Sequence, residues 1–153
     1  MLLPALLWLT TLAACGGGSS PPRTASAAPP EAITRSGDVT IRASAVPTSM
    51  LGEVVARRYG IRSSEETILL LVALRRGKDA NETSVPAKVG VTVTDLSGQR
   101  QDVPMRELRS GDLLDYVGTV DISGPDTLRF VVRTVRENGE VSTLQFAREF
   151  HPL

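Results

Sequence analysis

The sequence predicts an all-β protein: an immunoglobulin-like or fibronectin type III-like antiparallel β-sandwich of about seven strands with one short helix. Three observations predict this fold class. Apolar and polar residues alternate along most of residues 37–153, as they do in half-buried strands. Glycine-containing turn signals separate these runs. Only one segment has helical spacing, and it is short. Residues 37–153 therefore predict one small two-sheet domain.

The expected strands follow one another at the spacing of an antiparallel sheet. The alternating segments are 39–44, 89–94, 114–122, 128–133 and 144–150. Residues 67–74 instead form a nearly continuous apolar run, which fits a central strand covered on both faces. Asn138-Gly139, between Val135 and Val141, predicts a β-hairpin, because both central residues of such a turn need positive φ.

Other turns are expected at Ser97-Gly98, at Ser110-Gly111 and at Gly124-Pro125-Asp126. One helix is expected over residues 48–59, where four apolar residues have helical spacing. They are Leu51, Val54, Val55 and Tyr59. Thr48 or Ser49 can cap the start of this helix, and Gly60 can end it.

The amino terminus predicts export. Residues 1–14 are uncharged and mostly apolar, and at about 1.5 Å per residue they are too short to span a bilayer. Such a run predicts a signal peptide. The segment from Leu12 to Gly16 resembles the lipobox of bacterial lipoprotein precursors, which implies lipidation at Cys15. The alternatives are an uncleaved apolar helix or cleavage after Ala14 by a general signal peptidase. The first basic residue is Arg23, so the usual positive charge before the apolar run is missing.

A tether is expected between the lipid and the folded domain. Residues 15–36 are rich in Gly, Ser, Ala and Pro, and such a composition buries too little apolar surface to fold. A flexible chain of this length holds a domain on the order of 25 Å from the bilayer. By resemblance to bacterial lipoproteins, Gly16 after the cysteine favours the outer membrane, with the domain in the periplasm.

Composition excludes several classes of function. Seventeen Lys and Arg residues balance seventeen Asp and Glu residues, so the chain lacks the basic footprint of a nucleic-acid-binding protein. One Cys and one His exclude an internal disulfide and the usual structural zinc sites. We expect no metal and no cofactor.

The folded part resembles the family known as domain of unknown function 4426. The resemblance is carried by Gly37-Asp38-Val39, Glu53-Val54-Val55-Ala56, residues 59–63, residues 106–112, Leu128-Arg129-Phe130, Phe146 and Glu149-Phe150. It implies a small exported gammaproteobacterial β-sandwich without an assigned activity. Two features depart from the family: Gly52 replaces an expected proline, and the lipobox with its tether is not general.

Catalytic motifs are missing from the sequence. It contains no GxSxG elbow, no glycine-rich phosphate loop and no HExxH. His151 is the single imidazole, and its place three residues from the carboxyl terminus suits a catalytic base poorly. We therefore expect no enzyme.

Two charged clusters are the candidate interaction surface. The first comprises Arg57, Arg58, Tyr59 and Arg62, whose guanidinium groups can bind an acidic partner. Alternatively, these cations complement the negative end of a helix dipole, with Tyr59 in the core. The second cluster comprises Arg106, Glu107, Arg109 and Asp112. Its alternative roles are a local ion-pair lattice or, for Glu107 and Asp112, a catalytic carboxylate pair.

These observations predict a lipid-anchored envelope protein whose sandwich binds a protein or an envelope component. Two alternatives stay open: an envelope hydrolase that uses carboxylate and arginine residues, and a structural spacer on the membrane.

Overall fold

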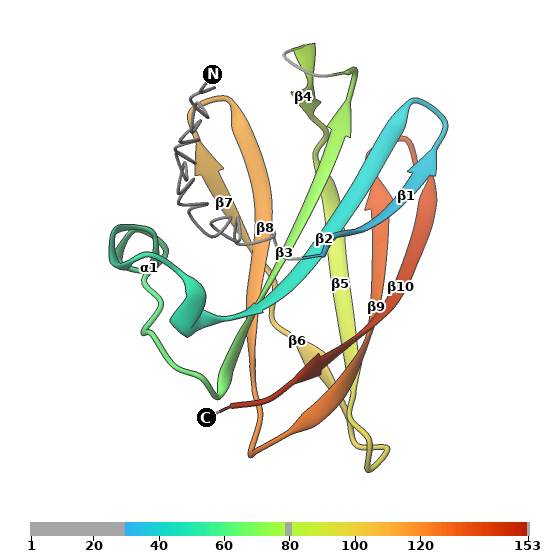
Figure 1. Ribbon diagram of the computed structural model, residues 1–153. Coiled ribbons are helices and arrows are strands. Elements are labelled where there is room, and N and C mark those ends of the chain that lie inside the picture. Colours follow the sequence, from blue (N-terminus) through green and yellow to red (C-terminus); the bar gives the residue numbers. More distant parts are fainter. Residues whose placement is uncertain (1–29, 79–80, 153) are drawn as a thin grey trace, which may run out of the picture.

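The computed structural model describes residues 30–78 and 81–152, which form two antiparallel sheets packed face to face (Figure 1). The predicted all-β sandwich is confirmed. Sheet A contains β1 (Ala32–Ser36), β2 (Val39–Pro47), β3 (Thr67–Arg76), β4 (Thr83–Ser84), β7 (Arg106–Ser110) and β8 (Leu113–Asp121). Sheet B contains β5 (Ala87–Thr94), β6 (Arg100–Val103), β9 (Asp126–Arg136) and β10 (Val141–Phe150).

The strand order is β1-β2-β3-β8-β7 in sheet A, with β4 also paired to β3, and β10-β9-β5-β6 in sheet B. The chain crosses between the sheets after β4, after β6 and after β8. The second crossing is short, because only Pro104 and Met105 separate β6 from β7. At these three places consecutive strands lie in different sheets, so each sheet is built from segments distributed along the described chain.

The core lies between the sheets. Strand β3 contributes Ile68, Leu70, Val72 and Leu74, none of them accessible to solvent. From sheet B, Phe130 stacks on Phe146 with ring centroids 4.8 Å apart. Leu69 and Ala73 on the opposite face of β3 are buried as well, which confirms a central strand covered on both faces.

The folded domain begins earlier than predicted. Residues 32–36, assigned to the tether, form β1 and pair with β2 from Ala32↔Ala43 to Ser36↔Val39. Composition did not show this strand because it is an edge strand with few apolar residues; backbone hydrogen bonds, which most residue types can make, hold it. The signal peptide, Cys15 and the tether up to residue 29 lie outside the described residues.

The strand β7 is also a correction. Residues 106–110 were expected to be a charged segment before a strand, and they are themselves a strand paired with β8. Together with β1, β4 and β6, it brings the described residues to ten strands instead of about seven. An edge strand that carries charges is protected against pairing with other chains, and this is why its sequence lacks apolar alternation.

The expected turns are confirmed at Ser97-Gly98, Ser110-Gly111 and Asn138-Gly139. In the last, Val135 pairs with Val141 across the hairpin and Gly139 has φ +82°, a conformation that favours glycine.

The predicted helix is shorter and presents a different face. Residues Thr48–Met50 form a 3-10 helix, η1, and Glu53–Tyr59 form the α-helix α1. Gly52, not Thr48 or Ser49, precedes the helix, and no side chain caps it. Gly60 ends it in the left-handed conformation, as expected. The predicted apolar face is wrong, because Val54 and Val55 are exposed and Ala56 is buried.

Candidate interaction surface

The end of α1 is fixed by main-chain hydrogen bonds. Gly60 has φ +66°, and the amide of Ile61 donates to the carbonyl of Ala56 at 2.9 Å. This closure turns the chain back from the helix. Ile61 becomes half-buried and lines a pocket of about 160 Å³ with Leu69 and Val117 of sheet A.

A threonine holds the segment that carries the helix. Thr48 is fully buried, and its Oγ1 lies 2.9 Å from the carbonyl oxygen of Arg62 and 3.1 Å from that of Ser64. The same Oγ1 accepts a hydrogen bond from the Ser64 amide at 2.9 Å. The expected capping residue therefore closes the loop after the helix instead of capping its start.

The structure brings the two predicted charged clusters together at one point. The guanidinium of Arg106, the first residue of β7, donates to the carbonyl oxygen of Tyr59, the last residue of α1. Carbonyls at the end of a helix lack partners within it and carry negative partial charge. One arginine from another element therefore complements the helix end. The dipole alternative expected this role of the cations of the first cluster, Arg57, Arg58 and Arg62.

We name as the α1–β7 surface the four arginines Arg57, Arg58, Arg62 and Arg106, together with Tyr59. The four arginines are exposed and Tyr59 is half-buried, so Tyr59 is not a core residue. Arg57 pairs with Glu53 at 3.0 Å, but both side chains are mostly exposed, and such a pair contributes little. Among the described residues, Arg58 and Arg62 have no carboxylate partner.

The rest of the second cluster extends along β7, away from the helix. Glu107 and Arg109 form an exposed pair at 3.3 Å. Asp112 lies in the turn after β7, and within the described part of the chain it makes no ion pair. The lattice that the sequence suggested is thus reduced to one exposed pair. Neighbouring residues of a strand point to opposite faces, which separates Arg106 from Glu107.

Exposed apolar side chains accompany the arginines. Met50, Val54 and Val55 are 62%, 65% and 39% exposed. Val54 and Arg58 are four positions apart in α1, so their side chains lie on the same side of the helix. The η1–α1 segment projects from sheet A at the side of the sandwich (Figure 1). The surface therefore combines cations with apolar groups.

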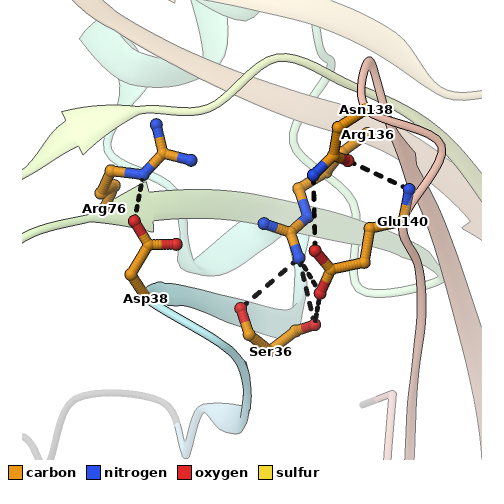
Figure 2. Close-up of polar contacts among 6 residues, drawn as sticks. All are labelled: Ser36, Asp38, Arg76, Arg136, Asn138 and Glu140. Atoms are coloured by element: carbon orange, nitrogen blue, oxygen red, sulfur yellow. Dashed lines mark hydrogen bonds and ion pairs between the residues drawn. The ribbon is translucent and has the colours of Figure 1, made fainter.

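A polar cluster around the buried Arg136, not predicted from the sequence, links two hairpins of the sandwich (Figure 2). We name Ser36, Arg136, Asn138 and Glu140 the Ser36–Glu140 cluster. The Ser36 hydroxyl and the Arg136 guanidinium both donate to the Glu140 carboxylate. Arg136 also donates to Ser36 Oγ at 3.1 Å. The cluster joins the β1–β2 hairpin of sheet A to the β9–β10 hairpin of sheet B.

The electrostatics of this cluster follow from these contacts. The hydrogen bond from Ser36 holds the pKa of Glu140 below its ordinary value, against the opposing effect of burial, and the charge of Arg136 adds to the lowering. Arg136 lies on the same inward-facing side of β9 as Leu128, Phe130 and Val132, so this charged side chain is buried. A charge at the end of an apolar alternation, four residues before a glutamate, is the sequence signal that could have indicated the cluster.

The remaining buried charge is also structural. Arg75 on β3 is buried and pairs with Asp115 on β8. Its Nη1 also donates to the carbonyl of Leu114 at 2.9 Å. These bonds satisfy the Arg75 guanidinium. Arg75 lies where the pairing of β3 with β8 ends and its pairing with β4 begins.

The described residues contain neither a metal centre nor a membrane span of the usual kinds. In residues 30–78 and 81–152, no three or more His, Cys, Asp or Glu side chains gather where they could hold an ion. No helix in this part of the chain has the length and apolar character to cross a membrane. His151 and Glu149 form an exposed contact at 3.0 Å near the carboxyl terminus.

Comparison with known proteins identifies a family. The family model described as "Domain of unknown function (DUF4426)" matches residues 33–152. No curated protein matches the sequence.

Solved structures share the fold. A DUF4426 family protein from Pseudomonas aeruginosa PAO1 has a TM-score of 0.68 and 22% identity, over 80% of this chain and 96% of that one. A copper-bound variant of FetP from uropathogenic Escherichia coli strain F11 has a TM-score of 0.53 and 11% identity, over 80% of this chain and 97% of that one. At these identities the likeness shows the fold alone.

Proposed function

The chain belongs to the DUF4426 family, and from that premise we propose that it is a lipid-anchored, non-enzymatic protein of the periplasm. Cys15 attaches it to the outer membrane, and its β-sandwich binds another component of the envelope through the α1–β7 surface. The anchor is supported by the sequence around Cys15.

One observation carries the binding role: Arg106 of β7 contacts the end of α1. The first cluster and Arg106, which lies about fifty residues later in the sequence, thereby form a single exposed cationic surface. Of its four arginines, only Arg57 has a carboxylate partner among the described residues. Exposed guanidinium groups are suited to carboxylate or phosphate ligands, because their planar donor pattern matches both. The surface thus favours an acidic component of the envelope.

The hydrolase alternative has less support. It requires Glu107 and Asp112 to act together, and both are exposed, with Glu107 paired to Arg109. A catalytic carboxylate with a raised pKa is usually placed in an apolar environment. We therefore do not propose a reaction.

The anchor is tested by fractionation. In cells fed radiolabelled palmitate, we expect the wild-type protein to carry label and to remain with the membrane fraction. Cys15→Ala removes the thiol that accepts the lipid, so the variant should lose both properties. The anchor is contradicted if the Cys15→Ala protein still fractionates with the membrane and the wild-type protein carries no label.

The binding role is tested by photo-crosslinking in cells. A photo-reactive amino acid is placed at position 58, on the surface, and in a second strain at position 133, on the exposed side of β9 in sheet B. We expect a specific envelope component, protein or lipid, to be recovered from position 58 only. Equal recovery from both positions contradicts a role for the α1–β7 surface.

A further inference from the structure

Exposed apolar residues are concentrated at one place in the fold. Seven large apolar side chains are exposed in the described part of the chain, and three of them lie within six residues, at Met50, Val54 and Val55. The other four are distributed over β1, the β5–β6 turn, β8 and β10, at Ile33, Leu96, Leu113 and Val141. A group of exposed apolar side chains in one short segment, here called the apolar patch, is a common mark of an interaction site.

Cations border this patch. Arg58 follows Val54 by one helical turn, and Arg62 follows in the loop after α1. Glu53, the one carboxylate within α1, pairs with Arg57. Glu65 and Glu66 come only where the chain enters β3. The carbonyl oxygen of Glu66 accepts a hydrogen bond at 2.8 Å from the amide of Ile122, which directly follows β8. The helix and the first residues after it therefore carry a net positive charge.

From this combination we propose that the α1–β7 surface and the adjoining residues Met50, Val54 and Val55 lie on the membrane and contact its anionic headgroups. This rests on the proposed lipid anchor and names the component that the surface binds. A short segment with apolar side chains between arginines is suited to the bilayer interface. There, aliphatic groups enter the headgroup layer while guanidinium groups remain at its phosphates.

The shape of the surface favours a bilayer over a protein partner. Met50, Val54 and Val55 stand on a projecting segment (Figure 1), and none of them lines the hollow of about 160 Å³ beside it. A projecting segment of valine, methionine and arginine fits a bilayer surface, because the headgroup layer deforms around it. Contact with a specific protein is an outcome that the experiment below distinguishes.

The length of the chain permits this orientation. Sixteen residues, 16–31, separate Cys15 from β1, and fully extended they span at most roughly 55 Å. β1 begins beside Ala43 of β2. Five residues further along the chain, about 17 Å away, β2 has ended and η1 begins at Thr48. The anchored end of the domain and α1 can therefore face the same membrane.

The lone cysteine makes a direct measurement possible. Lipidation would consume the Cys15 thiol, so Val54→Cys would introduce a single reactive thiol for an environment-sensitive fluorophore. Leu96→Cys is the matched control, because Leu96 is 75% exposed in the turn between β5 and β6. This turn lies away from α1 (Figure 1). Both full-length lipidated proteins are reconstituted into vesicles of phosphatidylethanolamine and phosphatidylglycerol, or of phosphatidylcholine alone.

We expect the fluorophore at position 54, in anionic vesicles, to shift its emission to the blue and to be quenched at least twofold more by nitroxide-labelled lipid than that at position 96. Arg58→Glu with Arg62→Glu, or phosphatidylcholine alone, should remove most of this difference. Equal quenching at both positions overturns the proposal. The proposal is also overturned if position 54 is buried in native membranes but not in protein-free vesicles, because a protein then covers the surface.

Failure of the anchor is detected separately, by flotation of the unlabelled wild-type protein before any fluorescence is recorded. If the wild type does not float with vesicles, the lipid-anchor proposal fails. Full-length Cys15→Ser protein with Val54→Cys or Leu96→Cys is then titrated with the same vesicles. A blue shift confined to position 54 and to anionic vesicles supports the contact, and no shift overturns it.

Discussion

Gly118 shows how one residue permits the crossing between the sheets. It lies on β8, and a Cβ at this position would be 2.7 Å from Val103 Cγ1, 2.7 Å from Met105 Sδ and 2.9 Å from the carbonyl oxygen of Pro104. Met105 can move, but the main chain of Pro104 cannot move without disturbing the β6–β7 connection. Only glycine lets this connection pack so closely on β8.

Gly118→Ala is therefore expected to destabilise the domain by about 1–3 kcal/mol, the usual cost of overpacking. Urea unfolding followed by circular dichroism measures the change. Gly90→Ala on β5 is the matched control, because a Cβ there meets nothing within 4 Å and φ is not positive. The control should be neutral or gain up to about 1 kcal/mol. An equal effect of the two substitutions contradicts the packing argument.

Glu140 gives the protein part of its pH dependence. Its pKa is lowered in the folded state, first by the Ser36 hydroxyl. A carboxyl whose pKa is lower when folded stabilises the protein fully above its unfolded pKa, and this contribution is lost as the pH falls through the folded value. Glu82 and Asp95 behave in the same way, through hydrogen bonds from Arg42 and Ser97.

Glu140→Gln should consequently lower stability at pH 7 and reduce the loss of stability on acidification below about pH 4.5, the ordinary value. Melting temperatures recorded from pH 7 to pH 3 measure both effects. Glu137→Gln alters an exposed residue in the same turn, one that makes no side-chain hydrogen bond in the described structure, and should follow the wild type. Parallel curves for Glu140→Gln and the wild type would show that the contact with Ser36 has no energetic role.

The η1–α1 segment shows at the scale of an element why a helix prediction failed in part. The spacing of apolar residues located the helix, and Gly60 marked its end. The face of the helix that packs on the domain is set by the loop that follows the helix. Thr48 binds this loop through Arg62 and Ser64, and Ala56 becomes the buried residue of α1. The valines are left exposed as a consequence.

Thr48→Val tests this dependence. It preserves the shape of the side chain and removes the hydroxyl, so buried main-chain groups lose a partner, at a cost of about 1–3 kcal/mol. We expect faster hydrogen exchange, with the largest increase in residues 48–66. Thr143→Val, at an exposed position of β10, should leave this exchange unchanged. An unaltered exchange rate in Thr48→Val would show that other contacts hold the segment.

The whole molecule is held by one apolar layer that both sheets share. Phe130 is fully buried and stacks on Phe146, and β3 contributes four inaccessible side chains from the facing sheet. The chain crosses between the sheets three times among the described residues. Neither sheet can therefore bury its apolar face alone, and we expect the domain to unfold in one cooperative transition.

Phe130→Ala should cost about 3–5 kcal/mol, because a large buried ring is removed from between the sheets. Unfolding monitored by far-ultraviolet circular dichroism and by an extrinsic fluorophore attached to β8 should give coincident curves in both proteins, at a lower urea midpoint for the variant. Val141→Ala, at an exposed position of β10, should change stability little. Separated transitions would show that the two sheets unfold independently.

The sequence by itself determined the fold class, the central strand, the main hairpin and the end of the helix. These features depend on local chemistry: alternation along one strand, glycine at a positive φ, or an unbroken apolar run. It also indicated both charged clusters, since arginine-rich segments are visible without knowing their neighbours.

Only the tertiary structure decided that residues 32–36 and 106–110 are strands, that Arg106 contacts Tyr59, and that Ser36 contacts Glu140. Edge strands are held by main-chain hydrogen bonds, which leave little pattern in the side chains. The other two contacts join residues 47 and 104 positions apart. Their partners are set by the order of strands in the sheets, and no local pattern along the chain specifies that order.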